Sequence, residues 1–187
     1  QATLEIKPEK AIKLEKDALA QIENITADNA RLVSNLHANL GGLYRMNGHP
    51  DLAREHMEKS ISLLDQFNLL HINDSIPQIA NYAMFLTEQQ EPERGISELQ
   101  KLSGIIKEYH SDDCLDYAKV QETLGTIYLM TANLPQAKTH FKRAFKIYEK
   151  IWADEPEMIE AKYQEIQELY PQIGFCIGKN LSGLLTK

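Results

Sequence analysis

The sequence is most constrained by a small residue that recurs inside apolar, helix-like segments at a fixed interval. Gly41 in "LGGLY", Ala83 in "NYAMFL" and Gly125 in "TLGTIY" are 42 positions apart each time. A tyrosine or leucine follows each of them three residues later. An internal period of this length predicts an array of similar units that stack on their neighbours.

A second set of small and apolar residues recurs at the same interval, further along each unit. Its members are Ala53, Met57 and Ser60, then Gly95, Leu99 and Leu102, then Ala137, Phe141 and Ala144. Spacings of three and four residues are typical of one face of a helix. Pro50, Pro92 and Pro135 stand near the start of this second helix, where proline is tolerated because the first turn lacks N–H partners. Each unit is therefore predicted to be a pair of helices.

The register extends beyond three complete units, so we predict one all-α repeat domain over residues 1–187. Its parts are a half repeat over 8–26, repeats over 28–68, 74–109 and 112–152, the first helix of a fourth repeat over 155–170, and a C-terminal capping segment over 171–187. A cap is expected because the last repeat would otherwise expose an apolar face.

The segment "LGTIY", followed by Ala137 and Phe141, resembles the tetratricopeptide repeat, whose pattern is W-x2-L-G-x2-Y, then A-x3-F, then P. The Trp of that pattern is replaced here by His37, Ile79 and Gln121. The resemblance implies a right-handed superhelical solenoid of antiparallel helix pairs. It also implies a concave surface that binds peptides or protein segments, and it implies no catalysis.

The period exceeds the usual 34 residues of these repeats, and it resembles the long-period branch that includes kinesin light chains and bacterial peptide-sensing regulators. First helices of that branch carry an asparagine just before the Leu-Ala or Leu-Gly pair. Asn39 and Asn81 occupy this place here. The resemblance implies that their side of each first helix faces the concave groove.

A stripe without Leu, Ile, Val or Phe runs along the first helices, because residues three, four and seven apart share a helix face. The candidate groove residues on and beside it are Asn35, Asn39, Gly42, Arg45, Asn81, Met84, Glu88, Lys119, Glu122, Thr123 and Thr126. Asparagine amides both donate and accept hydrogen bonds, which suits a peptide backbone. The charged members would select ligands by charge, and methionine offers adaptable apolar contact. The alternative interpretation is a solvated helix face, with any partner elsewhere.

The adjacent glycines Gly41 and Gly42 are predicted to have separate roles, although each costs about 1 kcal/mol in a helix interior relative to alanine. Gly41 shares its repeat position with Ala83 and Gly125, so we expect it to permit close contact between the two helices of a unit. Gly42 lies on the groove stripe. A leucine at Gly42 is therefore expected to hinder a ligand while leaving the fold nearly intact.

Composition and motifs argue against several functions. The formal net charge of −7 disfavours nucleic acid and anionic membranes as partners of this segment. No apolar run approaches the roughly 18–20 residues that span a bilayer. The two cysteines lack a metal-binding spacing, which favours reduced thiols in the cytoplasm. The six histidines are scattered, and no catalytic motif is present. We therefore expect no enzyme activity, no cofactor and no bound metal.

The sequence favours a protein-binding or peptide-binding module, and two alternatives remain open. The chain could be a ligand- or peptide-sensing domain of a larger regulatory protein, in which binding alters the repeats and thereby an attached output domain. It could also self-associate through the incomplete N-terminal unit.

Overall fold

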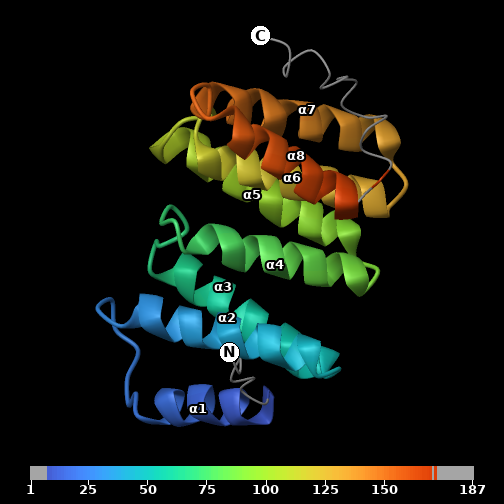
Figure 1. Cartoon of the computed structure of the whole chain (residues 1–187). Coiled ribbons are helices and arrows are strands. Elements are labelled where there is room, and N and C mark those ends of the chain that lie inside the picture. The colour runs from blue at the N-terminus through green and yellow to red at the C-terminus, as the bar shows by residue number, and fades with distance from the viewer. Residues whose placement is uncertain (1–7, 170, 172–187) are drawn as a thin grey trace, which may run out of the picture. The chain divides into compact units, whose positions relative to one another are not determined.

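The chain is all-α in the residues that the structure, a computed structural model, describes, namely 8–169 and 171 (Figure 1). The helices found there are α1 (Pro8–Ala20), α2 (Ala30–Met46), α3 (Pro50–Gln66), α4 (Ser75–Glu88), α5 (Pro92–Tyr109), α6 (Leu115–Met130), α7 (Leu134–Ile151) and α8 (Pro156–Leu169). They follow one another as antiparallel pairs, which confirms the predicted fold class. Apart from residue 171, the predicted capping segment 171–187 lies outside the described residues.

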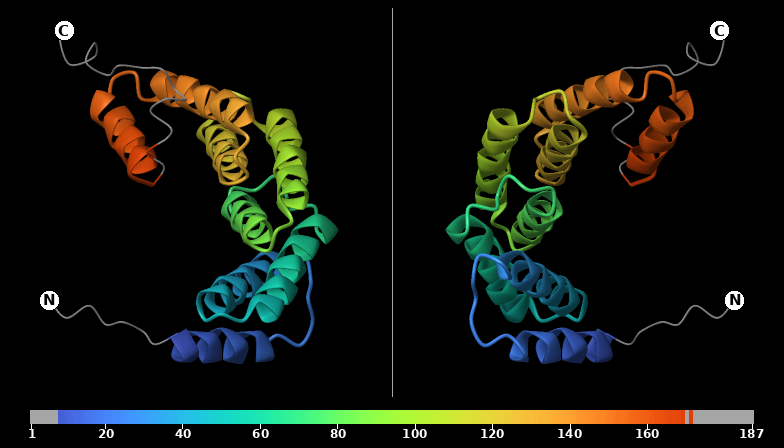
Figure 2. Two further views of the ribbon diagram at one scale, coloured as in Figure 1. Left: turned by 90° about the vertical axis from the view of Figure 1, so that its right-hand side faces the viewer. Right: turned by 90° about the vertical axis from the view of Figure 1, so that its left-hand side faces the viewer.

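The chain forms two compact units, Gln1–Ile105 and Ile106–Lys187, with the division inside α5. We call them the N-terminal unit and the C-terminal unit. In the N-terminal unit α3 lies beside α2, and in the C-terminal unit α7 lies beside α6, as both views of Figure 2 show. None of the described helices combines the length and apolar composition needed to cross a membrane.

The core of the N-terminal unit is built mainly from α2, α3 and α4. Its buried cluster contains Leu40, Tyr44, Ala53, Met57, Tyr82, Phe85 and Leu86. Ile12 and Leu19 of α1 pack against this cluster. Burying a leucine or phenylalanine side chain contributes about 1.5–3 kcal/mol, so the periodic apolar residues stabilise the helix pairs. The positions that the repeat pattern assigns to the interior of this unit are all buried.

The core of the C-terminal unit uses the equivalent positions of α6 and α7. Leu124, Gly125, Ala137, Phe141 and Ala144 are all buried, as the pattern predicts. Aromatic residues near the end of α7 extend this core toward α8. The pairs are Phe145 with Tyr163, whose ring centroids are 5.9 Å apart edge to face, and Tyr148 with Trp152, which stack at 4.9 Å.

Small residues allow the two helices of a pair to touch, as predicted for Gly41. A Cβ atom added to Gly125 would lie 2.9 Å from ring carbons of Phe141. In the middle pair the tight contact is made from the second helix, where a Cβ on Gly95 would lie 2.6 Å from the carbonyl oxygen of Ala83. These separations are too short for a methyl group, so glycine at these positions is a packing requirement.

The turn inside each helix pair has the same geometry and recurs with the same period. Gly48, Gln90 and Ala132 are 42 residues apart, and they have positive φ angles of 73°, 65° and 59°. The N–H of the residue that follows each of them donates a hydrogen bond to the carbonyl oxygen five residues earlier, as in the 2.7 Å bond from Asn133 to Tyr128. This arrangement is the helix-ending motif in which a left-handed residue lets the last carbonyls find partners. Only the first turn places glycine there.

Candidate functional site

The candidate groove in the N-terminal unit runs between α2 and α4. Side chains on the two helices meet at an offset of 43 residues, one more than the sequence period. The Asn35 Oδ1 accepts a 2.5 Å hydrogen bond from the Gln78 Nε2, and the Arg45 Nε donates a 2.8 Å bond to the Glu88 Oε2. A second guanidinium nitrogen of Arg45 contacts the other Glu88 oxygen, so this pair is bidentate.

Two hollows lie along this line and share Ala38, Gln78 and Asn81. The first has a volume of about 220 Å³ and is lined by Ala38, Gly42, Arg45, Met46, Met57, Ser60, Gln78 and Asn81. The second has a volume of about 330 Å³ and is lined by Asn35, Ala38, Asn39, Asp74, Pro77, Gln78 and Asn81. We call the two together the α2–α4 groove. Five of the candidate residues, Asn35, Asn39, Gly42, Arg45 and Asn81, line it, whereas Met84 and Glu88 line neither hollow.

Gly42 contributes open space to the groove. A Cβ atom added to Gly42 would meet nothing within 4 Å, in contrast to the crowded position of Gly41. Asn81 stands across the first hollow and is exposed. Its amide makes no side-chain hydrogen bond with the described residues. The Asn81 amide is therefore available to donate and accept hydrogen bonds beside the open space over Gly42.

The groove has a polar floor that the sequence reasoning missed. Ser34 and Ser60 are buried, and their hydroxyls donate hydrogen bonds of 2.8 and 2.5 Å to the Gln78 Oε1. With its oxygen held by two hydroxyls and its Nε2 bonded to Asn35, the Gln78 amide has a fixed orientation. Ser60 was recognised only as a core position, because its partner lies on another helix.

An acidic residue stands at one end of the groove. The Asp74 Oδ2 accepts hydrogen bonds of 2.7 Å from the Arg31 Nε and 3.2 Å from the Asn35 Nδ2. The hydrogen bond from Arg31, followed by that from Asn35, holds the pKa of the Asp74 carboxyl below its usual range. Asp74 is therefore an ionised acceptor at neutral pH, and it orients the Asn35 amide.

Asn39 differs from Asn81 because α1 already supplies a partner for it. The Asn39 Nδ2 donates a 3.0 Å hydrogen bond to the Glu15 Oε1. The second carboxylate oxygen of Glu15 is buried and has no hydrogen-bond partner among the described residues. Glu15 is thus a groove-side residue that the sequence reasoning missed, because nothing in the repeat pattern places α1 against this part of α2.

In the C-terminal unit, the candidate Glu122 belongs to a half-buried cluster between α6, α7 and α8. Its carboxylate accepts a 2.5 Å hydrogen bond from the Tyr148 hydroxyl and lies 3.3 Å from the Lys162 Nζ. Desolvation, followed by the charge of Glu122, raises the pKa of Tyr148. Glu122 therefore already has internal partners that connect three helices.

The other candidates of the C-terminal unit are less engaged or less accessible. Lys119 is exposed and lies 3.6 Å from the Asp116 carboxylate. The hydroxyl of Thr123 donates to the Lys119 carbonyl oxygen at 3.0 Å. Thr126 keeps only 9% of its surface exposed, so little of its side chain can meet a ligand.

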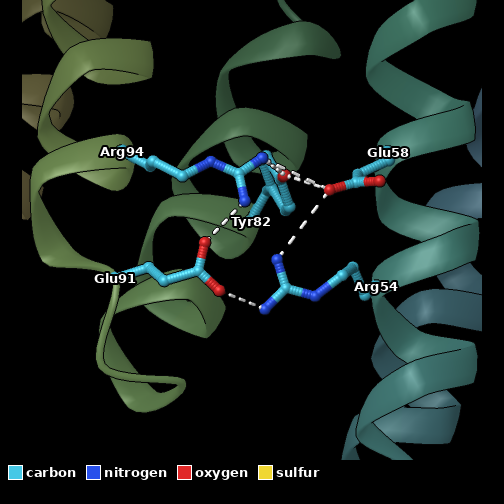
Figure 3. A network of polar contacts seen from close by, with 5 residues as sticks. All are labelled: Arg54, Glu58, Tyr82, Glu91 and Arg94. Carbon is cyan, nitrogen blue, oxygen red and sulfur yellow. Dashed lines mark hydrogen bonds and ion pairs between the residues drawn. The ribbon is translucent and has the colours of Figure 1, made fainter.

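A five-residue polar network on α3, α4 and α5 was also missed from the sequence. Figure 3 shows Arg54, Glu58, Tyr82, Glu91 and Arg94 converging. The Arg54 Nη2 lies 2.6 Å from one Glu91 oxygen, and the Arg94 Nη1 lies 2.5 Å from the other. The Tyr82 hydroxyl donates a 2.8 Å bond to Glu58. Desolvation and then the bond to Glu58 raise the pKa of Tyr82, so its hydroxyl stays protonated at physiological pH.

Two histidines meet between α2 and α3. The Nδ1 atoms of His37 and His56 are 2.8 Å apart, and the two rings are half-buried. Burial, reinforced by the neighbouring His56, lowers the pKa of His37 to about 4. Burial also lowers the pKa of His56. At neutral pH both rings are therefore uncharged, and one donates a hydrogen bond to the other.

The C-terminal unit has an equivalent contact two periods later. There the His140 Nδ1 lies 2.9 Å from the Gln121 Oε1, and His140 stacks on Tyr128 with a centroid distance of 5.3 Å. Gln121 replaces His37, one of the positions where the repeat pattern has tryptophan. The same interhelical contact is thus made by an amide in one unit and by a second imidazole in the other.

Comparisons with known proteins agree with this architecture. Residues 75–150 match the family model described as tetratricopeptide repeat. Among solved structures, the chain is similar to the crystal structure of BtubC (BKLC) from P. vanneervenii, with a TM-score of 0.66 and 20% sequence identity. The similarity covers 76% of this chain and 56% of BtubC, so the chain spans little more than half the length of that protein. No curated protein has significant sequence similarity to the chain.

Proposed function

We propose that the α2–α4 groove of the N-terminal unit binds an extended peptide segment of a partner protein, because residues 75–150 match the tetratricopeptide repeat family, whose members generally bind proteins. The observation that carries the proposal is the pairing of an unoccupied space over Gly42 with the available amide of Asn81. No catalytic chemistry is part of this proposal.

The chemistry of the groove favours a polypeptide as its occupant. Its side chains include the amides of Asn35, Asn39, Gln78 and Asn81. The amides of Asn35, Asn39 and Gln78 already bond within the unit. The Asn81 amide can donate to a C=O and accept from an N–H, and a peptide backbone presents both groups at every residue other than proline. The two adjoining hollows offer an elongated surface, which an extended segment fills better than a compact small molecule.

Charged residues at the ends of the groove add selectivity. Arg45 and Glu88 form a bidentate pair on the side of the first hollow, and Asp74 lies at the second. A partner carboxylate near Arg45 or a partner amine near Asp74 would be bound in preference to the opposite charge. These pairs are exposed to water, so we expect them to tune specificity more than affinity.

The proposal is tested with peptides selected from a displayed random library against the wild-type chain. Gly42→Leu fills the open space, and Asn81→Ala removes the amide. We expect each substitution to weaken binding of the selected peptides by about tenfold or more, which corresponds to at least about 1.4 kcal/mol.

The chain offers a matched control for each variant. Gly104 is another helical glycine with nothing within 4 Å of an added Cβ, but it lies on α5, outside the groove. Gln100 is an exposed amide on the same helix. Gly104→Leu and Gln100→Ala should leave the affinity unchanged. Equal affinity for all four variants, with folding intact by circular dichroism, would overturn the assignment of the ligand to this groove.

A further inference from the structure

The second helix of the last complete pair, α7, carries an unusual charge for this chain. It contains five basic residues, Lys138, Lys142, Arg143, Lys146 and Lys150, and a single acidic one, Glu149. The equivalent second helices α3 and α5 have as many acidic as basic residues or more. The chain as a whole has a formal net charge of −7. A concentration of positive charge on one helix is therefore a local feature that overall composition conceals.

The basic residues of α7 form a continuous ridge on the surface. Lys138, Lys142, Lys146 and Lys150 follow at intervals of four, so they lie on one side of the helix at a spacing of about 6 Å. All four, and Arg143 beside them, are exposed. We call these five residues the basic ridge. An ordinary surface helix mixes acidic and basic side chains on its exposed face, and the basic ridge lacks the acidic ones.

Most of the ridge has no internal counter-ion. Lys150 pairs with Asp113, and Arg143 donates a 3.4 Å hydrogen bond to the Gln121 amide oxygen. Lys138, Lys142 and Lys146 make no ion pair with the described residues. Three neighbouring ammonium groups repel one another, and an anionic partner would relieve that repulsion.

One end of the ridge borders a hollow of about 470 Å³ within the C-terminal unit. It is lined by Lys107, Asp112, Asp113, Tyr117, Arg143, Lys146, Ile147 and Lys150. Tyr117 and Ile147 are buried and form an apolar base, and the Lys107 Nζ lies 5.2 Å from the centre of the Tyr117 ring. Lys107 pairs with Asp112, and Lys150 pairs with Asp113, which also feels the charge of Lys146. With Arg143, four basic side chains line the hollow against two carboxylates, so positive charge is in excess.

We propose that the basic ridge of α7 is a second interaction surface, distinct from the α2–α4 groove, and that it docks a short acidic segment of a partner protein. The carboxylates of this acidic segment bind along the row of lysines, and one side chain of the segment enters the hollow beside Arg143 and Lys146. The spacing of about 6 Å along the ridge matches alternate residues of an extended chain, which rise by about 3.3 Å each.

The surroundings of the ridge favour a narrow polypeptide over nucleic acid or a membrane. The neighbouring α8 carries Glu157, Glu160, Glu165 and Glu168 against a single lysine, Lys162. A duplex or a lipid surface is wider than the screening distance of about 8 Å at physiological salt. It would meet the acidic α8 together with the ridge, and the rest of the chain would repel it. A single acidic segment contacts the ridge alone.

The experiment measures binding of a fluorescent polyglutamate peptide by anisotropy, at several salt concentrations. The test variant combines Lys138→Ala, Lys142→Ala and Lys146→Ala. The matched control combines Lys10→Ala, Lys13→Ala and Lys16→Ala, three exposed lysines of α1, which changes the net charge equally. We expect the test variant to bind at least tenfold more weakly and the control to bind within twofold of the wild type, with a dependence on salt that is weaker in the test variant.

Three outcomes would overturn the proposal: no binding by the wild type, an equal loss in both triple variants, or tighter binding of single-stranded DNA of the same charge. The test is independent of the proposed groove. Gly42→Leu and Asn81→Ala should leave polyglutamate binding unchanged even if they abolish binding of the selected peptides. Failure of one surface is therefore distinguishable from failure of the other.

Discussion

A Cβ atom placed on Gly41 would lie 2.5 Å from the Cγ of Met57, because α2 and α3 touch at this point. The main-chain nitrogen of Met57 and the carbonyl oxygen of Ala53 would also lie within 3.3 Å of it. The neighbouring Gly42 has no such contact. Two adjacent glycines therefore differ in what they do for the fold.

The first prediction compares alanine at these two positions. Gly41→Ala should lower the free energy of unfolding by about 1–3 kcal/mol, because the methyl group must displace Met57. Gly42→Ala should raise it by up to about 1 kcal/mol, since alanine is the better helix former and finds open space. Urea unfolding followed by circular dichroism at the helix band measures both. Equal changes in the free energy of unfolding for the two variants would contradict the close contact of α2 with α3 at Gly41.

Gly95→Ala should be at least as costly as Gly41→Ala, at about 3 kcal/mol. The atom that an added Cβ would meet here is the carbonyl oxygen of Ala83, at 2.6 Å. A side chain such as Met57 can rotate away, whereas a helix backbone must move as a whole. Gly104→Ala on the same helix is the control, and it should be neutral or stabilising. A neutral Gly95→Ala in the same urea measurement would contradict the tight contact of α4 and α5.

The third prediction concerns Ala132, whose φ angle of 59° is unfavourable for a residue with a Cβ atom. Ala132→Gly should stabilise the chain by about 0.5–1 kcal/mol, because glycine adopts this conformation without strain. Ala161→Gly, at an exposed position in the middle of α8, should instead destabilise it by about 1 kcal/mol. The melting temperature should rise for Ala132→Gly and fall for Ala161→Gly, each relative to the wild type. A loss of stability in Ala132→Gly would contradict the left-handed turn.

The fourth prediction follows from the His37–His56 contact. The folded pKa of His37 is about 4, below the usual 6.5, so the unfolded chain binds more protons as the pH falls between these values. The contribution of the neutral His37 ring to the free energy of unfolding is therefore complete above pH 6.5, and it is lost as the pH falls toward 4. His37→Gln should reduce this loss, because Gln121 makes the same contact with His140 without titrating. Melting temperatures at pH 7 and pH 5 measure the difference.

Carboxylates also titrate in acid, so the difference between wild type and His37→Gln isolates the contribution of His37. His56 keeps a lowered pKa from its burial, and part of the pH dependence should therefore persist in the variant. An identical pH dependence in the two proteins would contradict the buried, neutral state of His37.

The helix pairs and their core could be predicted from the sequence because both depend on local periodicity. Gly41, Ala83 and Gly125 identify the repeat, and the spacing of their neighbours defines which helix face is buried. The same reasoning separated Gly41 from Gly42, since consecutive helical residues point in different directions. The open surroundings of Gly42 in the structure agree with that assignment.

The polar contacts could not be predicted, because they join residues whose proximity depends on tertiary packing. Glu15 reaches Asn39 from another helix, and Arg54 reaches Glu91 across a helix and a turn. Long side chains can meet many different neighbours, so a residue type alone does not identify its partner. Ala132 was missed for a different reason, since alanine carries no signal for a positive φ. The roles assigned to the candidate groove residues remain predictions.

The recurring left-handed turn at Gly48, Gln90 and Ala132 also makes this gene easy to lengthen or shorten. A crossover that joins Gln90 to Asn133 deletes one period and leaves a complete turn between α4 and α7. The joined helices would place Ala83 opposite Ala137 and Phe141, where the parent pairs have glycine at Gly95 or Gly125, so a substitution to glycine would be needed to restore the close contact. Unequal recombination at these turns therefore changes the number of helix pairs without interrupting a helix, so the length of such chains can vary by whole periods.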